Sequence, residues 1–161
     1  MEFLRGNAIV GQSGGPTAAI NATLSGVIRG AFEHSDVIEK IYGMRNGIEG
    51  FLEERIVDLT EFFEDTTKID TLELTPAAAL GSCRKKLRDC ASDRETYERL
   101  LSLFKKYDIR YFFYIGGNDS MDTVLKLSKF MEDHSYEMRI IGVPKTVDND
   151  LAATDHTPGF G

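Results

Sequence analysis

The sequence predicts an α/β fold: a three-layer, Rossmann-like domain in which helices cover both faces of a mostly parallel sheet. Two observations carry this prediction. Short apolar segments of strand-forming residues alternate with helical segments of ten residues or more, and no internal repeat or low-complexity tract interrupts that alternation. Such a pattern indicates parallel strands joined by crossover helices, because a long crossover is needed to return the chain to the starting edge of the sheet.

The first half of the chain predicts two strands, one helix and a turn. Asn7–Gly11 is short and apolar, which favours a buried strand. The next segment predicts a helix with Pro16 in its first turn, where the missing N–H costs no hydrogen bond. Its apolar face at helical spacing comprises Ile20, Leu24, Val27, Ile28 and Ala31. A second strand is predicted at Val37–Tyr42 and a turn at Asn46–Gly50.

The second half predicts a weakly ordered stretch and then a clear strand–helix alternation. Residues 55–80 favour one edge strand at Ile56–Leu59 and short helical pieces. Glu95–Tyr107 predicts a helix that buries Tyr97, Leu100, Leu101 and Phe104. Tyr111–Ile115 predicts a central strand and Ile140–Val143 a buried last strand. The helix between these two strands is indicated by Met121, Val124, Leu125 and Met131.

Composition and charge argue against two classes of function. The 161 residues are 42% hydrophobic and 28% charged, as is typical of one soluble globular domain. A net charge of −7 argues against nonspecific nucleic-acid binding, because a phosphate backbone attracts basic faces. No apolar stretch approaches the roughly 20 residues that span a membrane, and no signal-peptide pattern opens the chain. We therefore expect a cytoplasmic protein in which Cys83 and Cys90 are reduced.

Glycines and polar residues gather at three predicted corners, each following a strand. The corners are Ser13-Gly14-Gly15, Gly116-Gly117-Asn118-Asp119-Ser120 and Lys145–Asp150. The carboxyl ends of parallel strands share one edge of the sheet, and ligands of open α/β sheets bind there. We therefore expect the three corners to converge on one site.

Paired glycines at the first corner favour an anion site. Because Gly14 and Gly15 lack side chains, their backbone N–H groups can approach a phosphate closely, and the N-terminus of the following helix adds positive potential. The corner is neither a Walker A loop nor a GxGxxG fingerprint. A plain tight turn explains the two glycines equally well on their own.

The second corner repeats this design and adds polar side chains. Gly116 and Gly117 bring the backbone close, and Asp119 is a candidate ligand for hydrated magnesium, which favours a carboxylate and retained waters. The alternative is that Asp119 or Ser120 caps the following helix.

The third corner carries two carboxylates, a hydroxyl and a cation within six residues. If the chain stays extended, Asp148 and Asp150 point to the same side, where two carboxylates need a cation, a shared proton or open water. Lys145 supplies positive charge nearby and Thr146 a hydroxyl. These groups together suit transfer of a charged group such as a phosphoryl. The alternative is a solvated loop.

A basic cluster stands out in this acidic chain. Arg84 and Lys85 follow a Gly-Ser loop and are predicted to bind phosphate. A solvated helix face explains Lys86 and Arg88. The three histidines are scattered along the sequence, and no metal site is predicted at them.

These segments, in this order, resemble the phosphofructokinase family. The resemblance covers nearly the whole chain, through Ser13-Gly14-Gly15 with Asn21, Leu80–Arg84, Gly116–Ser120, Pro144–Asp150 and Thr154–Gly161. It implies that residues 1–161 are an N-terminal donor-binding and catalytic domain, and that a second, substrate-binding domain is absent from this chain. We therefore expect a longer protein, and little or no activity from residues 1–161 alone.

Two positions are similar to the pyrophosphate-dependent members of the family. ATP-using members typically carry Gly-Gly-Asp-Gly at the second corner and Pro-Gly-Thr before the paired carboxylates. Here Asp119 replaces the last glycine, where its side chain would intrude on a nucleotide's α-phosphate, and Lys145 adds a cation beside the transferring phosphoryl. The resemblance thus implies reversible phosphoryl transfer from pyrophosphate to the 1-hydroxyl of fructose 6-phosphate, giving fructose 1,6-bisphosphate.

The resemblance also implies a role for each site residue. Asp148 is the base that takes the hydroxyl proton, Lys145 stabilises phosphoryl charge, and Asp150 and Thr146 position the sugar and the transferring group; Asp119 completes the catalytic set. Pyrophosphate is held by Gly14, Gly15, Arg84, Lys85, Gly117 and Ser120. The implied cofactor is Mg²⁺, with Asn118 and Asp119 as candidate ligands. The family's magnesium carboxylate usually matches Asn118, which is an amide here, so we expect Asp119 to contribute more.

Three other functions stay open from the sequence. One is an ATP-dependent 6-phosphofructokinase with atypical corners. Another is a non-catalytic sensor of sugar phosphates or nucleotides on the same fold. The third is a lipid or nicotinamide-nucleotide kinase, which shares a Gly-Gly-Asp style corner but does not account for Lys145 and the paired carboxylates. The full-length protein is expected to be a homo-oligomer, a dimer or a tetramer.

Overall fold

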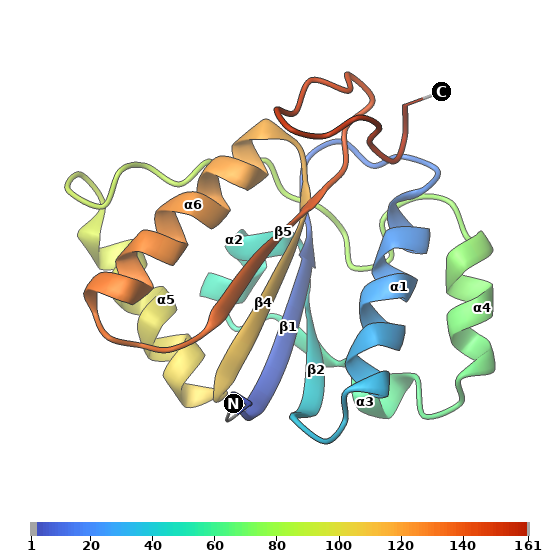
Figure 1. Cartoon of the computed structure of the whole chain (residues 1–161), viewed down its shortest axis with the longest axis horizontal. Helices are drawn as coiled ribbons and strands as arrows, with labels where there is room; N and C mark the ends of the chain where they lie inside the picture. Colours follow the sequence, from blue (N-terminus) through green and yellow to red (C-terminus); the bar gives the residue numbers. More distant parts are fainter. Residues whose placement is uncertain (1–2, 161) are drawn as a thin grey trace.

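Five strands form one sheet in the order β3-β2-β1-β4-β5 (Figure 1). The computed structural model describes residues 3–160; Met1, Glu2 and Gly161, the last residue of the final matching segment, lie outside that range. The strands are β1 (Gly6–Gln12), β2 (Ile38–Met44), β3 (Ile56–Asp58), β4 (Ile109–Gly116) and β5 (Arg139–Pro144). Only the β2–β3 pairing is antiparallel. The predicted mostly parallel sheet and the predicted edge strand are therefore confirmed.

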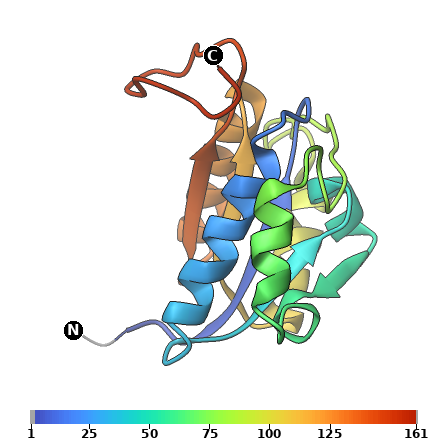
Figure 2. The same ribbon diagram turned by 90° about the vertical axis from the view of Figure 1, so that its right-hand side faces the viewer.

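Helices cover both faces of the sheet, as the sequence predicts (Figures 1 and 2). One face carries α1 (Ile20–Glu33), α3 (Leu59–Phe62) and α4 (Thr67–Leu74), and the other carries α2 (Gly47–Leu52), α5 (Arg94–Lys106) and α6 (Asn118–Asp133). Figure 2 shows α1 and α4 standing in front of the sheet. No helix within residues 3–160 combines the length and the apolar character that crossing a membrane requires.

The middle strand, β1, is buried on both faces. Ala8 and Val10 pack in the core beneath α1, while Ile9, between them, packs in the opposite core with Phe104 of α5 and Phe112 of β4. Successive side chains of a strand point to opposite faces, so a strand covered on both sides is apolar at nearly every position. This explains why the segment around Ala8 reads as a continuous apolar run.

The strand order reverses between β1 and β4. From β1 the chain crosses through α1 on one face to β2, whereas from β4 it crosses through α6 on the other face to β5. The two crossover helices leave a crevice between the carboxyl ends of β1 and β4, which is where open α/β sheets bind ligands. The topology alone therefore marks the edge that carries Ser13 and Gly117.

Two predicted local structures near the first two strands are wrong. The helix α1 begins at Ile20 with Ala19 as N-cap, so Pro16 lies in the preceding loop and not in the first helical turn. The segment predicted as a turn at Asn46–Gly50 starts with left-handed backbone at Asn46 but continues as α2. Both Ile48 and Phe51 are fully buried on that helix, and this packing outweighs the low helix propensity of the neighbouring glycines.

The predicted burial of the last strand is also wrong, whereas the predicted helix before it is confirmed as α6. The last strand, β5, is an edge of the sheet in residues 3–160 and leaves Ile141 38% exposed. Leu125 of α6 is 69% exposed, because it lies on the side of the helix that faces away from β4 and β5. It is two residues from both Thr123 and Leu127, which lie on the buried face of α6.

Glu54 connects the end of α2 to α5 through three hydrogen bonds. Its carboxylate accepts from the Lys106 amine, from the Tyr107 hydroxyl at 2.7 Å and from the Arg99 guanidinium at 2.8 Å. Hydrogen bonds from Lys106, Tyr107 and Arg99, in that order of effect, lower the pKa of Glu54 to about 2. Because the folded-state pKa lies below the usual 4.5, the contribution to stability is present above pH 4.5 and is lost as the pH falls towards 2.

We expect Glu54→Gln to be less stable than the wild type at neutral pH, with the difference shrinking as the pH falls from about 4.5 to about 2. Urea unfolding at a series of pH values measures this. The matched control is Glu64→Gln, because Glu64 is exposed and makes no ion pair within residues 3–160. A Glu54→Gln curve parallel to the wild-type curve through this pH window would contradict the role of the charge.

Candidate active site

The three corners meet at one cavity of about 550 Å³ at the carboxyl edge of the sheet. Segments far apart in sequence supply its wall: the β1–α1 loop, the segment around Arg84, the start of α6 and the chain after β5. The predicted convergence is therefore confirmed. All predicted site residues line the cavity, namely Gly14, Gly15, Arg84, Lys85, Gly117, Asn118, Asp119, Ser120, Lys145, Thr146, Asp148 and Asp150.

A hydrogen bond between two serine hydroxyls ties the first corner to the second. Ser13 follows β1, Ser120 lies in the first turn of α6, and the two buried hydroxyls bond to one another. A Cβ atom at Gly116 would lie 2.0 Å from the Ser120 Oγ and 2.7 Å from the Ser13 Oγ, so only glycine leaves room for this pair. The sequence places Ser13 at the corner but gives no reason to expect this contact.

The first corner differs from the predicted anion loop in two respects. The N–H of Gly14 donates to the carbonyl of Cys83 at 2.9 Å, so this group is not directed at the cavity. The helix α1 begins only at Ile20, so its N-terminus does not adjoin the glycines. Positive charge comes instead from side chains: a Cβ at Gly14 would lie 3.5 Å from the Lys145 Nζ, and one at Gly15 3.7 Å from an Arg84 guanidinium nitrogen.

Lys145 is a buried cation at the wall of the cavity. Its side chain is only 3% exposed, and its amine donates a hydrogen bond to the carbonyl of Gly15. Burial lowers the pKa of the Lys145 amine, and the nearby Arg84 guanidinium lowers it further. A desolvated ammonium interacts with an anion far more strongly than one in water does, so this position favours a charged ligand.

The second corner opens α6 towards the cavity. Gly117 is the N-cap, and no side chain caps the helix. The alternative that Asp119 or Ser120 caps this helix is therefore wrong. The Asp119 carboxylate instead accepts from the Lys86 amine at 2.8 Å, which raises the pKa of Lys86. The uncapped N–H groups at the start of α6 leave positive potential at the cavity wall.

The third corner turns instead of staying extended. After β5 ends at Pro144, the chain turns at residues 147 and 148, and Asn149 has a left-handed backbone with φ 50°. The prediction that Asp148 and Asp150 point to one side of an extended chain is therefore wrong in its geometry, although both still line the cavity. Asp150 accepts a hydrogen bond from the side-chain amide of Asn118 at 2.6 Å, whereas Asp148 is exposed.

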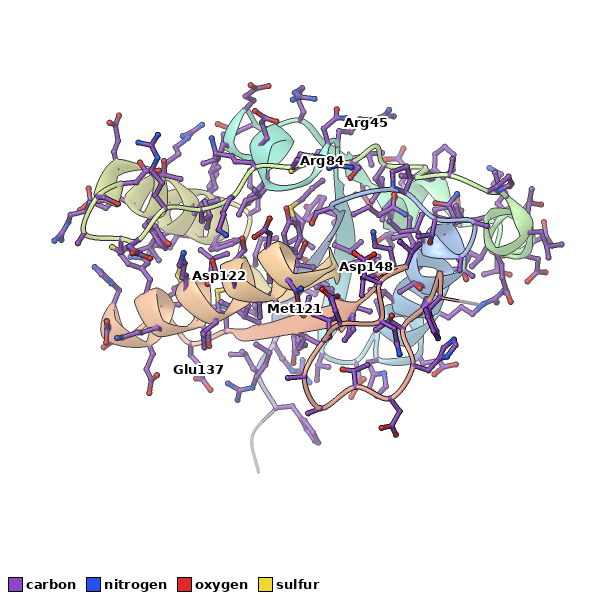
Figure 3. All side chains as sticks on the ribbon, turned by 90° about the horizontal axis from the view of Figure 1, so that it is seen from above. Arg45, Arg84, Met121, Asp122, Glu137 and Asp148 are labelled. Carbon is purple, nitrogen blue, oxygen red and sulfur yellow. The ribbon has the colours of Figure 1, made fainter. Side chains whose placement is uncertain are left out.

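The basic cluster lies on an irregular segment and not on a helix. Residues 81–89 have no helical structure, which removes the solvated helix face as an explanation for Lys86 and Arg88. Arg84 and Lys85 line the cavity, while Lys86 pairs with Asp119. Figure 3, seen from above the carboxyl edge of the sheet, shows Arg84 and Asp148 on separate segments at this edge.

Ser13 of the first corner also lines the cavity, as do four residues that were not predicted as site residues: Pro16, Thr17, Cys83 and Val147. Each of these residues directly adjoins a predicted site residue or follows the first corner. This adjacency in the sequence is the signal that identifies them as candidates. The Thr17 hydroxyl is buried without a hydrogen-bond partner in the described part of the chain. Cys83 lies 3.6 Å from the hydroxyl of Tyr114, whose pKa burial raises far above its usual value.

The oxygen-rich wall fits a hydrated magnesium ion. Asn118, Asp119, Asp148 and Asp150 offer amide and carboxylate oxygens to one cavity, and Mg²⁺ prefers oxygen ligands while keeping several waters. Within residues 3–160, no three His, Cys, Asp or Glu side chains gather closely enough to form a metal site by themselves. A metal here would therefore depend on a ligand's own oxygens and on water.

Comparison with known proteins gives a consistent result. The family model described as Phosphofructokinase matches residues 7–161. A protein of Halomonas elongata named pyrophosphate–fructose 6-phosphate 1-phosphotransferase is 52% identical over 155 residues, which cover 96% of this chain and 36% of that protein. Crystal structures named as pyrophosphate-dependent phosphofructokinases are also similar. That of Nitrosospira multiformis has 50% identity and a TM-score of 0.87 over 95% of this chain, and that of Marinobacter aquaeolei 49% and 0.85 over 96%.

The alignments cover nearly all of this chain but only about a third of the length of its relatives. The chain spans 37% of each of the two similar crystal-structure chains. Because the family model covers all but the first six residues, the five matching segments belong to one continuous alignment. The chain therefore belongs to the phosphofructokinase family.

Proposed function

We propose that this protein catalyses reversible phosphoryl transfer from pyrophosphate to the 1-hydroxyl of fructose 6-phosphate. One observation carries the proposal. The buried amine of Lys145 and the carboxylate of Asp119, the two side chains that distinguish pyrophosphate-using from ATP-using members, both line the cavity formed by the three corners. Similarity to relatives named as pyrophosphate-dependent enzymes supports it.

The chemistry requires a base, a cation and a donor pocket in one place. In the forward direction Asp148 takes the proton of the 1-hydroxyl, the sugar oxygen forms a bond to the transferred phosphorus, and the bond from that phosphorus to the bridging oxygen breaks, which releases phosphate. Lys145 stabilises the charge on the transferring group. Thr146 and Asp150 position the sugar and that group.

The rest of the cavity wall is proposed to hold the donor. Arg84 and Lys85 supply positive charge on one side. Gly14 and Gly15 leave space for a phosphate because they lack side chains, while Gly117 and Ser120 place it at the positive N-terminus of α6. Asp119, with Asn118, would hold Mg²⁺, which neutralises phosphate charge when it is bound.

A coupled assay tests the donor directly. The protein expressed from its complete reading frame is supplied with fructose 6-phosphate, magnesium and either pyrophosphate or ATP, and formation of fructose 1,6-bisphosphate is followed. We expect turnover with pyrophosphate and none with ATP. Turnover with ATP alone would leave the assignment of Asp148 as the base intact and would overturn the assignment of pyrophosphate as the donor. Absence of turnover with either donor would favour the sensor alternative.

Asp119→Gly is expected to weaken pyrophosphate use and to admit ATP as a donor. The change removes the side chain that narrows the cavity beside the start of α6, and it also removes a proposed magnesium ligand, so the magnesium concentration for half-maximal rate should rise. Steady-state kinetics with both donors over a magnesium series measure this. Asp122→Ala is the matched control, because that carboxylate lies one turn along α6 and pairs with Lys126 at 2.8 Å. Unchanged magnesium dependence and pyrophosphate use in Asp119→Gly would refute both roles.

A further inference from the structure

Among the residues that the structure describes, Asp148 is held in place only through its backbone. Its carboxylate is exposed and accepts no hydrogen bond within residues 3–160, although it is the proposed base. Its backbone N–H donates to the Thr146 hydroxyl at 3.2 Å. The location of the carboxylate therefore depends on whatever fixes the turn from Thr146 to Asn149.

Thr157 fixes the start of that turn. It is fully buried, and its hydroxyl donates to the backbone carbonyl of Thr146 at 2.6 Å, two residues before Asp148. A buried hydroxyl that bonds a backbone carbonyl eleven residues earlier in the sequence constrains both segments, because each polar group would lose free energy if left unpaired.

Asn149 fixes the end of the turn. Its side-chain oxygen accepts from the backbone N–H of Thr157 at 2.9 Å, and its side-chain nitrogen donates to the carbonyl of Asp155 at 3.1 Å. Its left-handed backbone, φ 50°, is a conformation that asparagine tolerates better than most residues. The residues on both sides of Asp148 are thus anchored to the same short stretch of chain.

That stretch, residues 155–159, is itself anchored to the first corner. Gly159 has φ 96°, and a Cβ there would lie 2.6 Å from the Thr17 Cγ2 atom, so the glycine packs directly on the loop after β1. Figure 2 shows the chain after β5 rising above the end of the sheet and returning towards the top of α1. The stretch therefore braces the third corner against the first.

The geometry points to Thr157 and Asn149 as positioning residues: through residues 155–159 they hold the Thr146–Asn149 turn so that Asp148 reaches the substrate hydroxyl. This inference rests on the proposed function and extends it to two residues that lie outside the cavity wall. A base that shifts by about 1 Å can lose on the order of 100-fold in rate, while donor binding at Arg84 and Lys85 stays intact.

Thr157→Val tests the role, because it keeps the shape and removes the hydroxyl. In the protein expressed from its complete reading frame, we expect kcat to fall by about 10- to 100-fold, with the KM for pyrophosphate changed by less than about twofold. Thr157→Ser, which restores the hydroxyl, should recover most of kcat. Thr154→Val is the matched control, since its hydroxyl makes no hydrogen bond within residues 3–160.

Asn149→Gly provides an independent test if Thr157→Val fails to fold. Glycine accepts the left-handed backbone, and the change removes the side-chain hydrogen bonds of Asn149 to Asp155 and Thr157. We expect kcat to fall while the KM for pyrophosphate again changes by less than about twofold. If the wild type turns over and both variants keep its kcat, the positioning role is overturned while the proposed function stands. A loss of kcat that follows a loss of thermal midpoint and is not rescued by Thr157→Ser would also overturn it. A wild-type protein without pyrophosphate-dependent turnover would overturn the proposed function and this role with it.

Discussion

Asp148→Asn is expected to lower kcat for pyrophosphate-dependent phosphoryl transfer by about 10²–10⁴-fold, the usual contribution of a positioned general base. The substitution keeps the size of the side chain and one acceptor oxygen but removes its ability to take the proton of the 1-hydroxyl. Because Asp148 is exposed, the free energy of unfolding should change by no more than about 0.5 kcal/mol. Steady-state kinetics and urea unfolding of the same preparation separate the two effects.

The control for this prediction lies in the same part of the chain. Asp155 is also exposed. Within residues 3–160 its side chain makes no hydrogen bond or ion pair, and its backbone carbonyl accepts a hydrogen bond from the Asn149 side chain. Asp155→Asn should therefore leave kcat within about twofold of the wild type. If Asp148→Asn retains wild-type kcat, another group takes the proton, and the assignment of the base is wrong.

Lys145→Met is expected to lower kcat/KM for pyrophosphate by about 10²–10³-fold, comparable to the loss of one preorganised donor at a developing negative charge. The amine is almost fully buried beside the Gly15 carbonyl and lines the cavity, so water cannot replace it easily. Methionine fills a similar volume without charge. Initial rates over a pyrophosphate series measure the effect.

Stability should move differently from activity in this variant. Burial lowers the pKa of Lys145, because the folded state disfavours the charged form of the amine. This charged form therefore lowers the free energy of unfolding at neutral pH. The loss disappears as the pH rises towards 10.5, the usual pKa of lysine. Lys145→Met removes this cost and also removes one hydrogen bond, so the thermal midpoint should stay within a few degrees of the wild type. Lys129→Met, an exposed change on α6, is the control. Unchanged kcat/KM in Lys145→Met would refute its role.

The sequence predicts the sheet and the convergence of the site because both follow from patterns longer than one element. Buried strands such as β1 carry a continuous apolar segment, here Ala8–Val10, and parallel topology then brings their carboxyl ends together. The position of each strand along the sheet is less visible: β5 reads as buried because Ile140 and Val143 are apolar, yet it forms an edge in the described residues. The composition of a strand does not show whether another strand pairs with it on each side.

Local geometry at the corners was predicted less well, for identifiable reasons. Pro16 suits a first helical turn, but α1 begins at Ile20 because the loop after Ser13 must first pass around the cavity. Two carboxylates at Asp148 and Asp150 share a side only in an extended chain, and the tertiary contacts of Asn149 impose a turn. Contacts between segments far apart in sequence, such as Lys86 with Asp119, leave no local pattern to detect.

The central place of β1 in the sheet has a consequence for how this molecule forms. β1 ends at Gln12, yet one of its two hydrogen-bonded neighbours, β4, begins only at Ile109. Until then an apolar strand presents an unpaired edge, the kind of surface that recruits other chains. Ser13 meets Ser120 across 107 positions of sequence, and contacts of such separation slow folding. The crevice between the carboxyl ends of β1 and β4 thus forms only after β4 has been synthesised, and a functional assay reports on that later step rather than on the earlier β1–α1–β2 unit.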